Sequence, residues 1–251
     1  SGAARSRKAG NWRRPSSRVS VRSDGAEGTG SSSDPSITAD GRYVAFQSYA
    51  NNLVDDDTGR SDIFVHDQQT GQTTRVSVAP GPSPQADNDS FLPSISADGC
   101  YVAFESLATN LVTGDSNGYQ DVFVHDRQTG QTTMVSMAFD GTQSDGNSHC
   151  PSISVDGQYV AFESDAANLV SGDNNNVCDA FIHDRQTGQT TMVSVASDGT
   201  QGDGGAVPDS LCSISADGQH VAFVSQASNL VPDDLNGYQD VFVSSWSNPA
   251  L

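Results

Sequence analysis

Residues 93–104 read PSISADGCYVAF, and closely similar twelve-residue stretches stand at three other places in the chain. These are PSITADGRYVAF at 35–46, PSISVDGQYVAF at 151–162 and CSISADGQHVAF at 212–223. A second block follows each copy, and in the second copy it reads DVFVHDRQTGQTTMVSM. Repetition at a period of about 58 residues is the signature of an architecture built from similar, stacked units.

Each unit has the pattern of four short strands. A Ser-Ile-Ser stretch runs into an Asp-Gly pair, which is the strongest short signal for a hairpin turn. In the second copy YVAFES, DVFVHD and TTMVSM supply the other three strands. Apolar residues fall on both faces, as at the neighbouring positions Val122 and Phe123, so both faces of the sheet must be covered. One unit cannot do this alone, and the pattern predicts an all-β fold, a β-propeller of four four-stranded blades.

The two ends of the repeat array complement each other. The last unit ends soon after its third strand, whereas the motif of a fourth strand, Arg18-Val19-Ser20-Val21, stands near the N-terminus. It matches the RVSV of 75–78, and we expect this strand to close the last blade or to complete the last blade of a neighbouring chain. The predicted domains are a basic tail at 1–17 and a propeller at 18–251. Its units are expected at about 22–78, 79–137, 138–195 and 196–251, the last completed by 18–21.

Charge is divided unevenly along the chain. Seven of the twelve basic residues lie in the first 22 positions, which hold no acidic residue. That segment carries a charge of +7, so the rest of the chain must carry −26 to give the net charge of −19. A body this acidic repels nucleic acid and anionic membranes and attracts cations or a basic partner. No apolar run approaches the roughly 18 residues of a membrane-spanning helix. We therefore expect neither nucleic-acid binding nor membrane insertion.

The repeat resembles the TolB-like propeller repeats of secreted and periplasmic bacterial proteins. The likeness rests on the PSISADG-x-YVAFES and DVFVHDRQTGQTT blocks, together with the asparagine of the ANLV-type segment, found at Asn52, Asn110, Asn168 and Asn229. It implies an extracellular or periplasmic propeller that binds proteins. TolB-like propellers typically have six blades and this chain has four repeats. Four blades could close alone, or two chains could form one eight-bladed ring.

The loops between second and third strands carry the only recurring chemistry. The motif Asp-x-Asn-Gly-x-x-Asp places two carboxylates and an amide near a turn, and calcium takes six to eight such oxygen ligands. It resembles the end of the calcium loops of integrin-like propellers. The candidate ligands are Asp115, Asn117 and Asp121 in the second copy, Asp173, Asn175 and Asp179 in the third, Asp234, Asn236 and Asp240 in the fourth, and Asp56 and Asp62 in the shorter first copy. The alternative is an ordinary turn in which the last Asp caps backbone N–H groups.

No pattern predicts a catalytic site. His66, His125 and His183 each precede an Asp in the third strand. Neighbouring strand residues point to opposite faces, so such a pair cannot form the His–Asp bond of a catalytic triad. Neither a Gly-x-Ser-x-Gly elbow nor a zinc pattern occurs. We expect the protein not to be an enzyme.

Three cysteines are expected on one face of the propeller. Cys150 and Cys212 stand at the start of the first strands of units three and four, and Cys178 lies in the acidic loop of unit three. Cys100 belongs to the opposite face. A disulfide within the first group and buried thiols are both consistent with the spacing.

The expected function is that of a non-catalytic extracellular or periplasmic scaffold whose acidic loops bind a protein or another ligand. The alternative is a self-assembling structural subunit, an oligomer or filament joined through 18–21. A glycan-binding lectin or a hydrolase is less favoured, because only exposed carboxylates and a few aromatic residues such as Tyr119 and Tyr238 support it.

Overall fold

The computed structural model describes residues 16–81, 84–206 and 212–246, and strands are the only regular elements in these ranges. Blade one contains β1 (Ser32–Ile37), β2 (Tyr43–Ser48), β3 (Asp62–Asp67) and β4 (Thr73–Arg75). Blade two contains β5 (Ser90–Ile95), β6 (Tyr101–Ser106), β7 (Asp121–Asp126) and β8 (Gln131–Met134). Blade three contains β9 (Ser148–Ile153), β10 (Tyr159–Ser164), β11 (Asp179–Asp184) and β12 (Gln189–Met192). Blade four contains β13 (Ser213–Ile214), β14 (His220–Ser225) and β15 (Asp240–Ser245).

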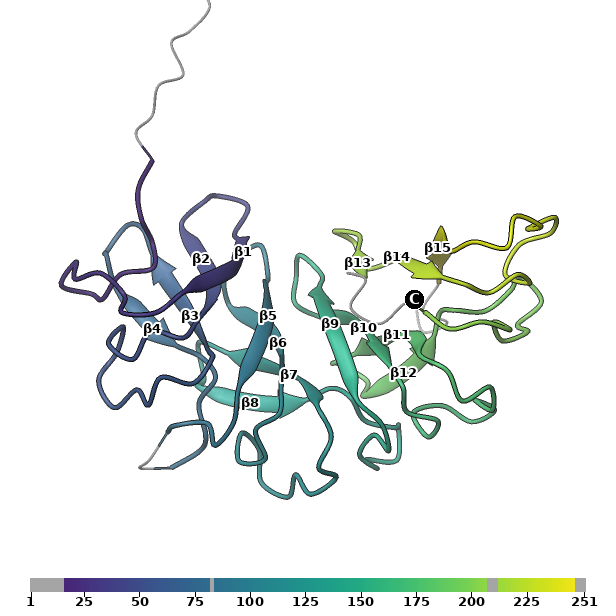
Figure 1. The fold of residues 1–251 in the computed structure, drawn as a ribbon, viewed down its shortest axis with the longest axis horizontal. Helices are drawn as coiled ribbons and strands as arrows, with labels where there is room; N and C mark the ends of the chain where they lie inside the picture. Colours follow the sequence, from purple (N-terminus) through teal and green to yellow (C-terminus); the bar gives the residue numbers. More distant parts are fainter. Residues whose placement is uncertain (1–15, 82–83, 207–211, 247–251) are drawn as a thin grey trace, which may run out of the picture.

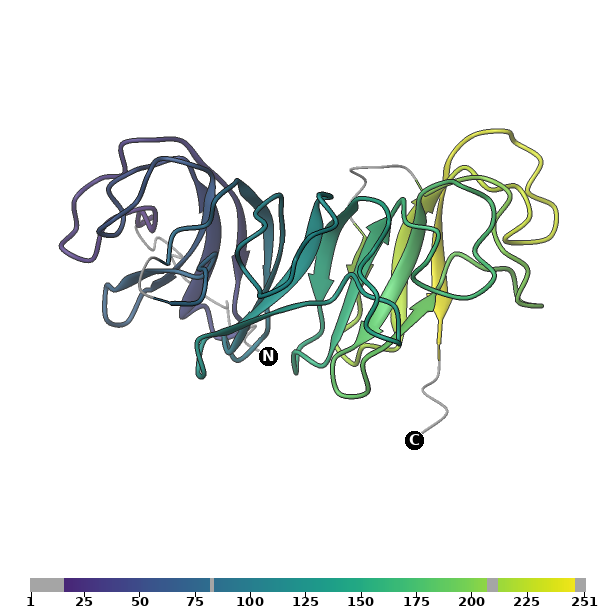
Figure 2. The ribbon, with the colours of Figure 1, turned by 90° about the horizontal axis from the view of Figure 1, so that it is seen from below.

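Each blade is an antiparallel sheet whose strands pair in chain order. Blades one to three have four strands and blade four has three in the described ranges. Figures 1 and 2 show the four sheets side by side in chain order along an arc that does not close into a ring. The predicted all-β fold of propeller blades is confirmed, and the array is open.

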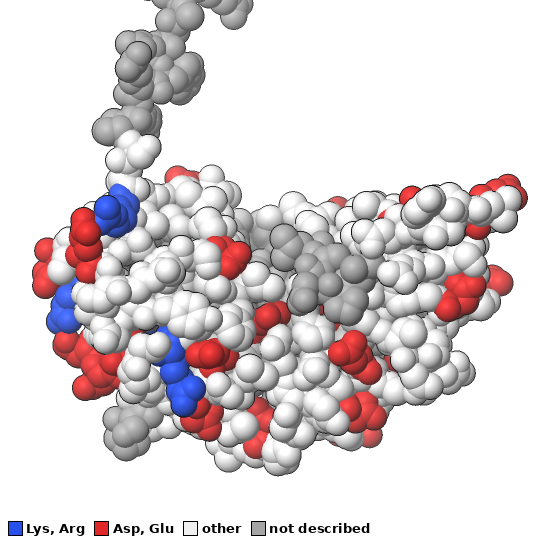
Figure 3. Space-filling view, viewed as in Figure 1, with Lys and Arg blue, Asp and Glu red and all other residues white. Residues whose placement is uncertain are grey.

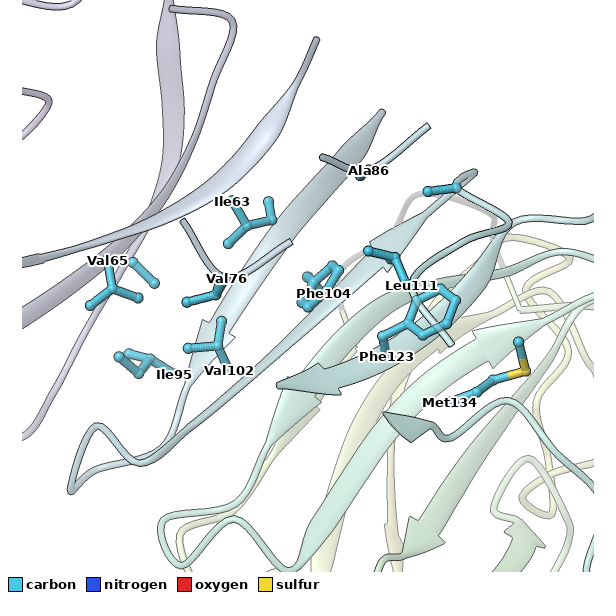
Figure 4. Packing of buried hydrophobic residues seen from close by; sticks show 12 residues of the cluster. Ile63, Val65, Val76, Ala86, Ile95, Val102, Phe104, Leu111, Phe123 and Met134 are labelled. Carbon is cyan, nitrogen blue, oxygen red and sulfur yellow. The ribbon is translucent and has the colours of Figure 1, made fainter. Parts of the chain in front are cut away.

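The core consists of apolar layers between successive blades. Between blades one and two, Ile63 and Val65 of β3 and Val76 pack against Val102 and Phe104 of β6 (Figure 4). Equivalent layers lie between blades two and three and between blades three and four. Because blades two and three are covered on both faces by their neighbours, both faces of their strands are apolar, as the repeat pattern predicts.

Serine hydroxyls join the first strands of neighbouring blades. The Oγ of Ser36 accepts a hydrogen bond from the N–H of Ile95, at 3.1 Å. The same bond recurs from Ile153 to Ser94 and from Ile214 to Ser152. The second Ser of the Ser-Ile-Ser motif acts within its own blade. Ser96 and its equivalents donate to the Asp of the Asp-Gly turn and accept from a main-chain N–H of the second strand.

An aromatic contact joins the same blades near the Asp-Gly turns. The Tyr43 ring lies against Gly99 of the next blade, so closely that a β-carbon there would meet ring carbon Cδ2 at 2.5 Å. The guanidinium of Arg127 stacks over this ring at 4.4 Å from its centroid and donates to the carbonyl of Gly99. Gly99 also has a φ of 73°, so no other residue fits the turn without strain.

The N-terminal strand motif does not close the last blade, which corrects one form of the prediction. Val21 forms an isolated bridge with Glu27, and its carbonyl accepts a hydrogen bond from Thr73 Oγ1. Met137, at the end of the outer-strand motif of blade two, makes the same contact with Thr190 of blade three. Residues 18–21 thus lie on blade one, in the place of the outer strand of a preceding blade. The open arc holds β15 at its other end (Figure 1), which explains why the two do not meet within one chain.

In the ranges that the structure describes, no helix is long and apolar enough to cross a membrane.

Candidate functional site

Asparagine side chains hold the acidic loops together on one side of the blades. The Nδ2 of Asn110, in the loop between β6 and β7, donates to the carbonyl of Gln85 at 3.0 Å. Its Oδ1 accepts from the N–H of Asp87 at 3.0 Å, so one side chain binds the loop that joins blades one and two. The same pair of bonds recurs at Asn52, Asn168 and Asn229. The repeated asparagine therefore positions the two kinds of loop side by side, as the strand order predicts.

Several acidic residues of the connecting loops are engaged in this packing. The Asp87 carboxylate accepts from the N–H and Oγ1 of Thr109, at 2.8 and 2.7 Å. Asp145 and Asp203 accept equivalent main-chain bonds from the neighbouring loop. Hydrogen bonds from Ser228 lower the pKa of Asp203. These carboxylates are parts of loop–loop contacts.

The last Asp of each predicted calcium motif is buried in blades one to three. Asp121 is fully buried, and its Oδ1 accepts from Ser136 Oγ at 2.6 Å and from Ser144 Oγ at 2.8 Å. Asp62 and Asp179 are equally buried and accept 2.6 Å bonds from Ser77 and Ser194. Burial raises the pKa of all three carboxyls, against the effect of these hydrogen bonds. These aspartates therefore fasten the outer strand to the third strand.

A second carboxylate lies beside each buried aspartate. Burial and the charge of Asp121 raise the pKa of Asp115 to about 6. One buried oxygen of Asp115 has no hydrogen-bond partner, and the same holds for Asp173 in blade three. In blade one this place is taken by Asp57, whereas the predicted ligand Asp56 is exposed. Because the first loop is one residue shorter, Asp57 rather than the predicted Asp56 stands in the position of Asp115 and Asp173.

Amide N–H groups occupy the positions beside these carboxylates. The Nδ2 atoms of the motif asparagines Asn117, Asn175 and Asn236 donate to Asp121, Asp179 and Asp240, at 2.6 to 3.0 Å. Their Oδ1 atoms accept main-chain N–H groups two residues further on.

In blade three, Gln201 Nε2 bridges Asp173 and Asp179, at 2.7 and 3.1 Å. Among the described residues, no group of three acidic, His or Cys side chains is placed to hold a metal ion. The loops form hydrogen-bonded turns in which amide N–H groups donate to the carboxylates. Calcium binding remains a prediction.

The strand-three histidines bind threonines of the fourth strand. His125 and His183 are buried, and burial lowers the pKa of each to about 4. The Nδ1 of His183 lies 3.0 Å from Thr190 Oγ1, whose hydroxyl donates to Met137 O at 2.6 Å. The hydroxyl proton is thus committed, so His183 donates through Nδ1–H as a neutral ring. The same contact between a histidine and a threonine recurs in blades one to three, where it joins the third strand to the fourth.

The three cysteines predicted on one face come together near Glu105 and Glu163. Cys212 Sγ donates to the main-chain carbonyl of Cys150 at 2.9 Å, and the Cys150 N–H donates to Glu105 at 2.7 Å. Burial and the charge of nearby acids raise the thiol pKa of Cys178 and Cys212. No disulfide joins any two of the four cysteines, all of which lie in the described ranges. Deeply buried, protonated thiols react slowly with oxidants, and of the two alternatives that the spacing allows this structure contains the buried thiols.

A groove between blades two and three was not predicted. Its volume is about 910 Å³, and it is lined by residues 138–140, 167–172 and 189–192. Phe139 lies at its rim with 74% of its surface exposed. The signal in the sequence is a lone aromatic residue in a loop, where the other repeats carry Pro80 and Ser197.

Basic residues gather at one end of the molecule. Figure 3 shows Lys and Arg atoms only toward blade one, while acidic residues are distributed over the whole visible face. Of the described arginines, Arg42, Arg127 and Arg185 are stacked on tyrosine rings. The loops of blades two to four thus present carboxylates with few cations to neutralise them.

Comparison with known proteins finds likeness in structure alone. No protein-family model matches the chain, and no curated protein is found to be similar in sequence. TolB from Acinetobacter baumannii superposes with a TM-score of 0.50 at 19% identity, over 86% of this chain and 41% of that one. A putative TolB from Agrobacterium tumefaciens gives 0.48 at 16% identity, over 84% and 66% of the two chains. An oligogalacturonate lyase in complex with manganese gives 0.49 at 13% identity, over 86% and 49%.

The chain therefore spans less than half the length of the Acinetobacter TolB. Identity at this level carries the architecture and leaves the activity open. The blades of this chain have the fold of a TolB-like β-propeller.

Proposed function

We propose that this chain is a non-catalytic scaffold that binds a basic polypeptide segment on its acidic loop face. The observation that carries the proposal is the groove beside Phe139, because it combines an exposed aromatic side chain with the carboxylate of Asp140 on the adjoining loop position. Binding sites on propellers and other rigid scaffolds are commonly made by such loops. The TolB-like resemblance favours an extracellular or periplasmic location for this role.

Two features of the groove favour a peptide with one apolar anchor. Phe139 and the side chains of Leu169, Val170 and Met192 give it an apolar wall. Asp140 also lines the groove and is exposed, and its Oδ1 accepts the main-chain N–H of Thr142 in an Asx turn. An extended segment with an aliphatic or aromatic residue flanked by Lys or Arg would satisfy both features.

The test is titration of a fluorescent Lys-rich peptide that contains one Leu or Phe. We expect binding that weakens as salt is added, because exposed charges are screened. Phe139→Ser should weaken it about tenfold, the usual cost of losing an interface anchor of this kind. The matched control is Val155→Ser, a substitution at another exposed apolar residue outside the groove. Equal binding by the parent and Phe139→Ser would show that the peptide is attracted only by the overall negative charge and does not bind in the groove.

A further inference from the structure

The outer face of blade four is apolar and uncovered. Val241 and Val243 of β15 are 73% and 66% exposed. The equivalent residues of the third strand in blade one, Ile63 and Val65, are 0% and 1% exposed, and those of blades two and three are equally buried. A groove of about 780 Å³, lined by 231–236 and 240–243, runs along this face. Among the described residues, no strand pairs with the second edge of β15.

The polar groups at the free edge of β15 indicate which kind of strand would pair with it. In blades one to three, the buried Asp that begins the third strand binds the Ser of the outer-strand motif, and that Ser Oγ also accepts the next main-chain N–H. Asp240 holds this position in blade four and is bound by Asn236 as its equivalents are bound by theirs. The missing element is a strand with a serine in register, Val-Ser-Val or Val-Ser-Met.

Residues 18–21 carry that motif and already occupy the right place on the other end of the arc. Their contact with Thr73 puts them where the outer strand of a preceding blade would lie. Val19 is partly exposed, although its equivalents Val76, Val135 and Val193 are 2% exposed or less. Ile37 of blade one is 59% exposed, although Ile95 and Ile153 at the same position are 7% and 8% exposed. Blade one thus carries one strand of a preceding blade, residues 18–21, and an exposed apolar surface on which the other three strands of such a blade would pack.

We propose that the occupant of the blade-four face is blade one of a second copy of this chain, together with its residues 18–21. The composite blade would take β13, β14 and β15 from one copy and its outer strand from the other. In blade one the N–H of Val76 donates to the carbonyl of Ile63 and Ser77 Oγ donates to Asp62. In the same register, the N–H of Val19 would donate to the carbonyl of Val241, and Ser20 Oγ would donate to Asp240. Val241 and Val243 would be buried against the apolar face of blade one.

Charge supports the same pairing. Arg18 is the equivalent of Arg75, whose guanidinium lies 3.6 Å from the carboxylate of Asp62 in blade one. It contacts Glu27 as Arg75 contacts Gln85. In the composite blade Arg18 would lie between Glu27 of its own copy and Asp240 of the other, beside Asp233 and Asp234 of the groove. One cation between these carboxylates lessens their repulsion.

A second copy fits better than the chain's own N-terminal strand. The two complementary surfaces lie at opposite ends of the arc (Figure 1), so neither end can reach the other without distortion of the three interfaces between the blades. The surfaces differ from each other, which makes the contact heterologous, and such contacts are satisfied at both ends only when a ring closes. Two copies supply eight blades for that ring.

The first test is the mass of the chain in solution by light scattering at micromolar concentrations. We expect an assembly of two copies, twice the chain mass of 26.2 kDa. Val243→Asp should give the monomer, because a carboxylate cannot be buried in the apolar layer. Tyr119→Asp is the matched control, since it places the same charge on an exposed aromatic side chain elsewhere and should leave the assembly unchanged. A parent chain that is monomeric throughout overturns the proposal.

The second test separates contact in trans from closure in cis. Val19→Cys and Val241→Cys are made in separate chains, both with Cys100→Ser, because the other three cysteines are buried. A short thiol cross-linker should join the mixed chains into a heterodimer, and should join neither variant to itself. Cross-linking within a monomer that carries both substitutions, without any heterodimer in the mixture, would refute the proposal. Both tests are independent of the peptide-binding groove, so either proposal can fail alone.

Discussion

At the scale of the residue, the recurring chemistry of this chain is a buried Asp–Ser bond. Asp121 loses solvation on burial, which raises its pKa, and Ser136 offsets part of this cost through a 2.6 Å hydrogen bond. Ser136 also accepts the N–H of Val122 at 3.2 Å. One hydroxyl therefore satisfies a buried charge and a buried main-chain group of the third strand. This explains why the outer-strand motif keeps serine in each copy where valine would pack equally well.

Ser136→Ala should destabilise the protein by about 2 kcal/mol, because a charge-assisted hydrogen bond is lost and both partners stay buried. Chemical denaturation monitored by circular dichroism measures the change. Ser116→Ala, at an exposed loop position, is the control and should lie within about 0.5 kcal/mol of the parent. Equal losses in the two variants would mean that the Asp–Ser bond contributes no net stability.

At the scale of the element, each loop between second and third strands is a turn closed by amides. Gln201 donates to both Asp173 and Asp179, so a neutral group bridges two carboxylates. The bridge spans 22 residues, from the loop between blades three and four back to the start of β11. The motif alone showed the acids and the turn, but it could not show that the amide of a distant glutamine enters between them.

Gln201→Glu should convert this turn into a calcium-dependent one. The variant loses the bridging donor and gains a third carboxylate, so without calcium it should melt below the parent. Millimolar calcium should then raise its melting temperature more than that of the parent, because the ion binds only the folded variant. Gln201→Leu controls for the lost donor and should not respond to calcium. A parent that responds as strongly as Gln201→Glu would show that the wild-type loop already holds the ion.

At the scale of the whole molecule, the repeat predicts the blades but not the curvature of their array. Strand positions follow from local signals, such as the Asp-Gly turn before Cys100 and the alternation around Phe123. The angle between blades follows from side-chain packing across each layer, and four similar units are compatible with a closed ring or an open arc. For this reason the sequence shows that 18–21 match an outer-strand motif, but it does not show which blade they lie against.

Prediction of the site was limited in the same way. The aspartates and asparagines of the loops could be named from their spacing, because the motif is local. The burial of Asp121 could not, since it depends on Ser136 and Ser144 in other segments. The groove at Phe139 involves three segments from two blades, and no local pattern records their meeting.

The serine and tyrosine contacts between blades join nearest neighbours only, and this has a mechanical consequence. Blade four has one neighbour, three described strands and an uncovered face, so we expect it to unfold at the lowest force. Pulled by its ends in an optical trap, a single chain should yield in steps that begin with blade four and travel inward. Each step should release about 58 residues, or about 20 nm of contour length. A single rupture of the whole array would instead mean that force is shared among all the blades at once.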